Sequence, residues 1–234
     1  MPSGPPASLD QVLADPALAD APLRERLAAM AEAEARLYPE YGPPVEALIA
    51  RLRDNDVGVA APDVGDTMPD FRLPDETASL VGLTDLLAEG PAVLLFHRGH
   101  WCPYCQTVAM SLAGAQTAIT ALGGRMAAIL PDRQAHARRL KVQAGSRYPY
   151  LTDLDNGYAL SLNLVYWMGA ELAALYERDG DIIPLYQGNA AWFLPIPATF
   201  VVGRDGRVVA RFVDPDYRRR MAIDDLVAAV AAAR

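Results

Sequence analysis

Residues 92–105 read AVLLFHRGHWCPYC, and they carry the most informative pattern in the chain. The apolar run over residues 92–97 predicts a buried strand of a parallel sheet. Cys102 and Cys105 follow, and a C-x-x-C spacing directly after a strand is typical of a redox-active dithiol. Pro103 favours the first turn of a helix, because its missing N–H would have no partner there. The sequence therefore predicts strand, turn and helix, with both thiols at the start of the helix.

The two cysteines are expected to differ in exposure and acidity. Cys102 lies at the predicted N-cap, where free backbone N–H groups and the helix dipole favour an anion. We therefore expect the pKa of the Cys102 thiol to be lowered. Cys105 begins an apolar stripe, so we expect it to be more buried than Cys102. An exposed low-pKa thiol beside a buried partner forms a nucleophile with a resolving group, and this spacing permits a disulfide after a small adjustment.

Two other interpretations of the cysteine pair are open. The cysteines could be buried and inert, or they could join His97 and His100 as four ligands of the zinc type. The two histidines need not converge on one ion, however, and strand, cap, proline and spacing all agree with a redox pair. We therefore expect a dithiol site without metal or other cofactor. His100 is expected to be an exposed neighbour that tunes the thiol pKa, and His136 to lie on the surface.

The rest of the chain predicts an α/β domain with a mixed sheet. A strand–helix–strand half gives parallel strands, and a hairpin at Asp205-Gly206 adds antiparallel ones. Further strands are expected at 126–130, 148–151, 198–202 and 207–213. Helices are expected at 85–88, 103–122, 131–144, 156–164 and 222–233. Residues 165–195 are apolar with scattered Pro and Gly, and the pattern does not decide their structure.

Residues 1–60 are predicted to form an N-terminal helical extension that precedes a redoxin domain over residues 61–234. Residues 1–20 are rich in Pro, Ala and Asp, and are expected to be only partly ordered. An amphipathic helix is predicted over residues 23–38, ended by Gly42-Pro43-Pro44, with a shorter helix after it. Amphipathic stripes favour a cap packed on the main domain. A dimerisation arm, and hence a homodimer, is the alternative.

Composition excludes several classes of protein. Hydrophobic residues make up 52% of the 234 residues, which excludes disorder as the general state. The net charge of −8 argues against nucleic acid and anionic membranes as partners. No apolar run approaches the roughly 20 residues that span a bilayer. The first six residues show no secretory signal, and with only two cysteines we expect a cytoplasmic protein.

Four motifs lie within residues 62–234. They are Gly65-Asp66-x-x-Pro69-Asp70-Phe71, Phe96-x-Arg98-Gly99-x-Trp101-Cys102-Pro103-Tyr104-Cys105, Pro197-Ala198-Thr199-Phe200-Val201 and Asp214-Pro215-Asp216-Tyr217-Arg218. Together they resemble the peroxiredoxin-like branch of the alkyl hydroperoxide reductase/thiol-specific antioxidant (AhpC/TSA) family, within the thioredoxin-fold superfamily. The resemblance implies a thioredoxin-like fold, a central mixed sheet flanked by helices, and a redox-active site. It also implies that Pro197 follows a cis peptide bond and faces the cysteine pair.

The chain departs from the family pattern at two places. Peroxiredoxins typically carry Pro-x-x-x-Thr-x-x-Cys, and here the same spacing reads Arg98-x-x-x-Cys102-x-x-Cys105. This alignment puts Cys105 at the peroxidatic position and Cys102 in place of the threonine. The arginine that peroxiredoxins typically carry before the late strand is replaced by Pro197, and Arg98 could supply that charge. Thioredoxin-like disulfide reductases, by contrast, pair a C-x-x-C with a cis-proline.

Three hypotheses follow. The first is a thiol peroxidase that reduces hydroperoxides through a Cys102–Cys105 disulfide, regenerated by a thioredoxin- or glutathione-type reductant. The second is a protein thiol–disulfide oxidoreductase, in which Cys102 attacks and Cys105 resolves. The third is a non-enzymatic metal-binding or redox-sensing module. The resemblance over the whole domain favours the first hypothesis, and the local site residues alone favour the second. Candidate substrate contacts are Trp101, Tyr104, His100 and Thr199.

Overall fold

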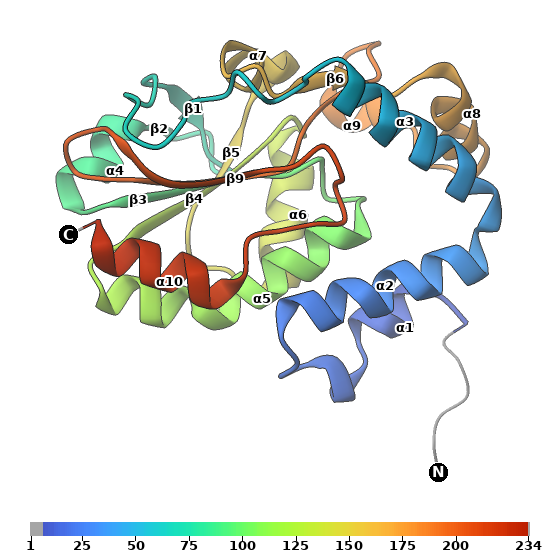
Figure 1. Ribbon diagram of the computed structural model, residues 1–234, viewed down its shortest axis with the longest axis horizontal. Coiled ribbons are helices and arrows are strands. Elements are labelled where there is room, and N and C mark those ends of the chain that lie inside the picture. The colour runs from blue at the N-terminus through green and yellow to red at the C-terminus, as the bar shows by residue number, and fades with distance from the viewer. Residues whose placement is uncertain (1–6, 234) are drawn as a thin grey trace.

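A five-stranded mixed sheet forms the centre of the protein in the computed structural model, which describes residues 7–233 (Figure 1). The strand order is β5-β4-β3-β8-β9. Strands β3, β4 and β5 are parallel, whereas β8 is antiparallel to both β3 and β9. Their bounds are β3 (Ala92–Phe96), β4 (Arg125–Leu130), β5 (Tyr150–Thr152), β8 (Ala198–Val202) and β9 (Val208–Val213). The predicted α/β fold of the thioredoxin type is confirmed.

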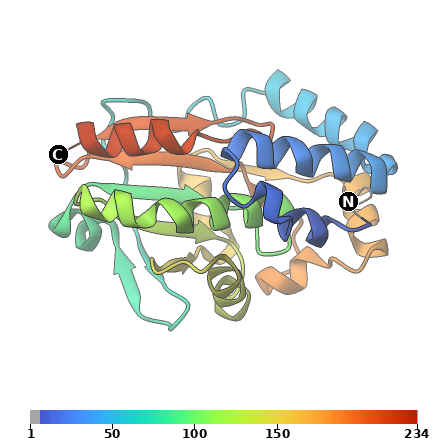
Figure 2. The ribbon, with the colours of Figure 1, turned by 90° about the horizontal axis from the view of Figure 1, so that it is seen from below.

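Helices and a small hairpin cover this sheet. Every residue of β3 and of β8 is buried, as expected for central strands covered on both faces. Helices α5 (Pro103–Ala121) and α10 (Ile223–Ala232) run side by side along one face (Figure 2). The remaining elements of this part are β1 (Arg72–Pro74), β2 (Leu80–Gly82), α4 (Leu83–Glu89) and α6 (Gln134–Ala144). No helix within residues 7–233 is long and apolar enough to cross a membrane.

Residues 165–195, which the sequence pattern left undecided, form four short elements. Strands β6 (Val165–Trp167) and β7 (Phe193–Pro195) make an antiparallel pair outside the main sheet. Helices α8 (Ala170–Arg178) and α9 (Ile183–Gln187) lie between them in the chain. Each element is at most nine residues long, so a periodic pattern has no room to show. The segment before them holds η3 (Leu154–Asn156) and α7 (Gly157–Ser161).

The N-terminal extension is helical, as predicted, with two differences. Its elements are α1 (Leu9–Leu13), η1 (Pro16–Leu18), α2 (Leu23–Leu37), η2 (Pro39–Tyr41) and α3 (Gly42–Asp54). The segment Gly42-Pro43-Pro44 begins α3 rather than only ending α2, since proline suits a first helical turn. Residues 7–20 form α1 and η1 instead of a partly ordered segment, whereas residues 1–6 lie outside the described chain.

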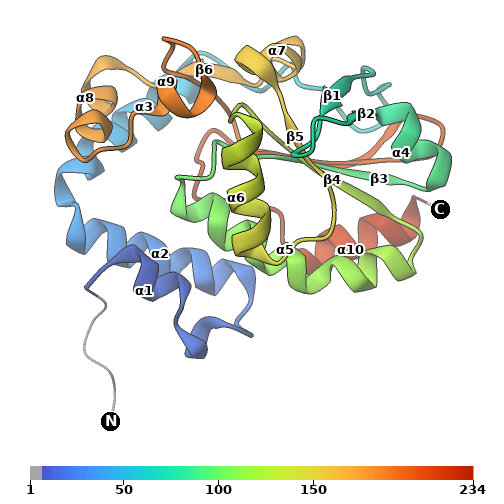
Figure 3. The same ribbon diagram turned by 180° about the vertical axis from the view of Figure 1, so that it is seen from behind.

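The extension and the main domain share one apolar core. Met30 of α2 and Ile49 of α3 are almost fully buried and belong to the same cluster as Leu94 of β3. Helices α2 and α3 curl around the end of the domain at which α5 begins (Figures 1 and 3). This end also carries the two cysteines. The division of the chain at residue 60 stays a prediction.

Candidate redox site

The C-x-x-C motif lies where the sequence predicts it. Strand β3 ends at Phe96, Cys102 is the N-cap of α5, and Pro103 occupies the first helical turn. Gly99 in the intervening loop has a φ of +156°, and a Cβ there would overlap the Trp101 indole. Glycine is therefore required for the close approach of this loop to Trp101.

Both cysteines are fully buried, with no exposed surface on either side chain. The expectation that Cys102 is the exposed member of the pair is therefore wrong. The physical reason is that other segments cover the start of α5. Trp101 packs edge-to-face on Tyr176 of α8, with ring centroids 5.1 Å apart, and Tyr104 packs on Tyr217 of the C-terminal segment at 5.4 Å. Local sequence patterns do not reveal such long-range contacts.

Cys105, rather than Cys102, is the acidic thiol. Burial alone would raise the pKa of Cys105, but a hydrogen bond from the Cys102 thiol and the charges of Arg220 and Arg98 lower it to about 6. The backbone N–H of Arg98 also donates to Cys105 Sγ at 3.4 Å. Burial and the same hydrogen bond raise the pKa of Cys102. The expected low pKa at Cys102 is therefore wrong, because the donors converge on the sulfur one turn further along.

Two guanidinium groups flank the cysteine pair. Arg98, a predicted site residue, is 1% exposed, and its Nη1 lies 3.6 Å from Cys102 Sγ. Its Cζ lies 3.9 Å from the ring centroid of Tyr217 and 4.9 Å from that of Trp101. Arg220, in the segment between β9 and α10, places Nη2 4.0 Å from Cys105 Sγ. Arg220 was not among the predicted site residues, although it ends a run of three arginines that begins with Arg218, the last residue of a motif of the resemblance.

Tyr104 connects residues 101–105, which we call the dithiol turn, to the N-terminal extension. Its hydroxyl donates to Glu34 of α2 at 2.7 Å, and burial raises the pKa of Glu34. Glu34 was not among the predicted site residues. A signal existed: the apolar stripe of α2 runs 23, 27, 30 and 37, and Glu34 occupies the next position of this stripe after Met30. A carboxyl group in an otherwise apolar stripe indicates a special partner.

The histidines do not serve the cysteine pair as expected. His100 is buried rather than exposed, and Asp132 accepts from its backbone N–H at 2.7 Å and contacts its Nδ1 at 2.8 Å. The His100 ring stacks on half-buried His136 at 4.4 Å. His97 is buried, and burial lowers its pKa to about 4. Within residues 7–233, no cluster of three or more His, Cys, Asp or Glu side chains could hold a metal ion, so the four-ligand alternative is not assembled.

Pro197 and Thr199 lie at the start of β8. The peptide bond before Pro197 is trans, so the expected cis bond is wrong. Trans is the favoured form of an X–Pro bond, and the Ile196 N–H just before Pro197 donates to the Leu164 carbonyl at 2.6 Å. Thr199 is buried opposite Leu95 of β3. The roles of Pro197 and Thr199 at the site stay predictions.

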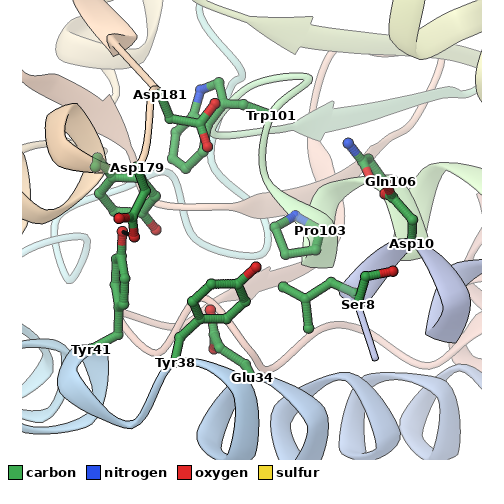
Figure 4. Close-up of a pocket in the computed structure, with 12 residues that line it drawn as sticks. Ser8, Asp10, Glu34, Tyr38, Tyr41, Trp101, Pro103, Gln106, Asp179 and Asp181 are labelled. Atoms are coloured by element: carbon green, nitrogen blue, oxygen red, sulfur yellow. Dashed lines mark hydrogen bonds between the residues drawn. The ribbon is translucent and has the colours of Figure 1, made fainter. Parts of the chain in front are cut away.

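A cavity of about 240 Å³ adjoins the site on the side of the N-terminal extension (Figure 4). Glu34, Tyr38 and Tyr41 form one wall, and Trp101, Asp179 and Asp181 lie opposite. The complete lining is Ser8, Leu9, Asp10, Glu34, Tyr38, Tyr41, Trp101, Pro103, Gln106, Tyr176, Asp179 and Asp181. Trp101 and Pro103 flank Cys102 in the chain, so the cavity lies directly outside the dithiol turn. We call it the vestibule.

Similar solved structures share the fold of this chain. Peroxidoxin BcpB from Mycobacterium tuberculosis is 22% identical, with a TM-score of 0.57. The superposition covers 74% of this chain and 99% of the BcpB chain. The bacterioferritin comigratory protein of Xanthomonas campestris is 15% identical with a TM-score of 0.54, covering 74% and 98%. Peroxiredoxin 6 of Arenicola marina is 16% identical with a TM-score of 0.55, covering 70% of each chain. Among curated proteins, none matches the sequence significantly.

The sequence model of the AhpC/TSA family matches residues 64–211, which is more than half of the chain. The match includes the dithiol turn, four strands of the central sheet and the first part of β9, and it leaves out both Glu34 and Arg220. Together with the fold, it shows that this chain belongs to the AhpC/TSA family.

Proposed function

We propose that this protein is a thiol peroxidase in which Cys105 attacks the hydroperoxide and Cys102 resolves the product. Membership of the AhpC/TSA family supports a peroxiredoxin-like or thiol oxidoreductase function. The observation that carries the finer assignment is the environment of Cys105 Sγ. A backbone N–H at 3.4 Å, a guanidinium at 4.0 Å and the neighbouring thiol all favour its thiolate. The thiolate, not the thiol, is the nucleophile.

In the first step the Cys105 thiolate attacks the outer oxygen of the hydroperoxide. An S–O bond forms and the O–O bond breaks, so the sulfur is oxidised to a sulfenic acid. The organic oxygen leaves as an alkoxide and takes a proton from water to become the alcohol. Arg220 and Arg98 stabilise the negative charge that moves from sulfur to oxygen.

In the second step Cys102 attacks the Cys105 sulfenic acid. The S–S bond forms, water leaves, and the thiol proton of Cys102 is carried off in it. The raised pKa of Cys102, caused first by its burial, keeps this sulfur protonated until the sulfenic acid has formed. An external dithiol of the thioredoxin or glutathione type then reduces the disulfide. The reductant, a cytoplasmic location and a homodimer stay predictions.

The competing function is protein disulfide exchange with Cys102 as the attacking thiol. Rapid mixing of the reduced protein with hydrogen peroxide or with an oxidised dithiol, followed by Trp101 fluorescence, separates the two functions. The proposal predicts that peroxide oxidises wild type and Cys102→Ser far faster than free cysteine, and that Cys105→Ser loses this reaction. Suppose instead that peroxide oxidises the protein no faster than it oxidises free cysteine, while disulfide exchange is rapid and is lost only in Cys102→Ser. The protein is then a disulfide oxidoreductase.

A further inference from the structure

A layer of side chains formed by Trp101, Tyr176 and Arg98 lies between the vestibule and the cysteine pair. Trp101 lines the vestibule and also lies beside Arg98, whose Cζ is 4.9 Å from the indole centroid. Arg98 in turn contacts Cys102 Sγ at 3.6 Å. Tyr176 packs edge-to-face on Trp101 in the same layer. A substrate in the vestibule would therefore lie next to the side chains that contact the dithiol.

The size and walls of the vestibule suit one compact organic group. Its volume of about 240 Å³ is slightly below the roughly 300–1,000 Å³ of pockets that hold drug-sized ligands. Tyr41 packs on Tyr176 at 5.2 Å, so the rings of Tyr41, Tyr176 and Trp101 form a continuous aromatic wall. Tyr38 adds a fourth ring beside Tyr41, with ring centroids 6.1 Å apart (Figure 4). These faces favour an aromatic or branched alkyl group rather than a long acyl chain.

The charges of the vestibule have one sign. None of its lining residues is Lys or Arg, whereas Asp10, Glu34, Asp179 and Asp181 are all carboxyl groups. Asp179 is paired with Arg178 at 2.7 Å, so Asp10, Glu34 and Asp181 remain as the sources of negative charge. Burial raises the pKa of both Glu34 and Asp181, so this environment already disfavours negative charge. A carboxylate brought into the same space would meet the same loss of solvation, and each of these carboxyl groups that is ionised would repel it.

We propose that the vestibule holds the organic part of the hydroperoxide and selects uncharged substrates with a compact aromatic or branched alkyl group over substrates that carry a carboxylate. This inference rests on the proposed peroxidase function and names the substrate class of the same site. The walls that make the selection come from α1, α2, η2, the dithiol turn and the segment of α8 and α9. Half of the lining thus lies outside the part that the family model matches.

The test compares three oxidants on the reduced protein by stopped-flow fluorescence: hydrogen peroxide, cumene hydroperoxide and cumene hydroperoxide with a para carboxylate. Each rate constant is divided by that for free cysteine with the same oxidant, which removes intrinsic reactivity. We expect this normalised rate constant to be about tenfold higher for the uncharged cumyl compound than for the carboxylate form. One like-charge contact at intermediate dielectric costs more than about 1 kcal/mol. Raising the salt concentration should narrow the difference.

Variants then locate the selection. In the double variant Glu34→Gln/Asp181→Asn, the ratio of the rate constants for the two cumyl compounds should move toward the ratio measured with free cysteine. Tyr38→Lys, at a partly exposed ring, should raise the rate with the carboxylate compound above the wild-type rate. Asp20→Asn is the matched control, because Asp20 is exposed before α2 and does not line the vestibule. Thermal unfolding of each variant verifies that it is folded.

The outcomes separate this inference from the function on which it rests. If no oxidant reacts faster than with free cysteine, the peroxidase function fails and the inference fails with it. If hydrogen peroxide is fast but both cumyl compounds react equally, only the inference is overturned. The same holds if the folded double variant and the folded Tyr38→Lys variant both keep the wild-type ratio.

Discussion

The part of the chain matched by the family model and the two segments that flank it contribute different things to the site. Residues 64–211 supply the sheet, α5, both thiols and Arg98. The flanking segments, residues 7–63 and 212–233, supply Arg220 at Cys105 and Glu34 at Tyr104. The thiol chemistry is therefore encoded in a short local motif, while much of its charge environment comes from outside the family match.

This division has a consequence for folding. The N-terminal flanking segment is part of the hydrophobic core, because its Met30 and Ile49 are buried in the same cluster as Leu94. Ordering this core brings α2 against α5 and closes the site over the cysteines. Folding and assembly of the redox site are thus expected to occur together.

Outside the cysteine pair, loss of Arg220 should have the largest effect on activity. In Arg220→Met the guanidinium 4.0 Å from Cys105 Sγ is removed, so the thiolate and the departing oxygen lose a charge partner. We expect the rate with hydrogen peroxide to fall by about 10²–10³, as for other single donors to a developing anion. Arg219→Met is the matched control, because Arg219 is exposed and pairs with Asp214 at 2.7 Å. Equal rates in the two variants would assign the charge effect to Arg98 alone.

A cavity in the extension should destabilise the whole domain. Met30→Ala removes a fully buried side chain of α2 and should cost about 2–5 kcal/mol of unfolding free energy in urea denaturation. A single transition, shared by far-ultraviolet and fluorescence signals, is expected. Leu160→Ala, at an exposed position, should change stability by less than about 0.5 kcal/mol. A separate early transition for the extension would show that the flanks fold independently of the family-matched part.

The hydrogen bond between the thiols should be measurable through the acidity of Cys105. Cys102→Ala removes the donor, whereas Cys102→Ser replaces it with a hydroxyl that can still donate. We expect the pKa of Cys105 to be higher in Cys102→Ala than in Cys102→Ser by about one to two units, since a hydrogen bond to a charged group contributes about 1.5–3 kcal/mol. The pH dependence of alkylation provides the values. Identical pKa values of Cys105 in both variants would show that this hydrogen bond does not lower the pKa of Cys105.

The smallest effect is expected at Glu34. Burial raises the pKa of this carboxyl group, so its contribution to stability is present in acid and is lost as pH rises through the folded-state pKa. Glu34→Gln cannot ionise. The unfolding free energy of wild type relative to this variant should therefore decrease from acid to neutral pH. A constant difference across that range would show that Glu34 is ionised normally in the folded protein.

The fold was largely predictable, because its main elements have strong local signals. The apolar run of β3, the proline and spacing of the dithiol turn and the hairpin after β8 each predict their structure from neighbouring residues. The short elements of residues 165–195 gave no periodic signal. The acidity of the two thiols was predicted the wrong way round, since the helix N-terminus suggested Cys102. Arg220 lies 115 residues from Cys105 in sequence, and only folding brings it to the sulfur.

The assignment of Cys105 as the acidic thiol is tested by titrating each thiol separately through its thiolate ultraviolet absorbance. Cys102→Ser reports Cys105 alone, and Cys105→Ser reports Cys102 alone. We predict a midpoint near pH 6 for Cys105, and a midpoint for Cys102 above the ordinary range of a thiol. A low midpoint for Cys102 and a high one for Cys105 would contradict the assignment and would make Cys102 the nucleophile.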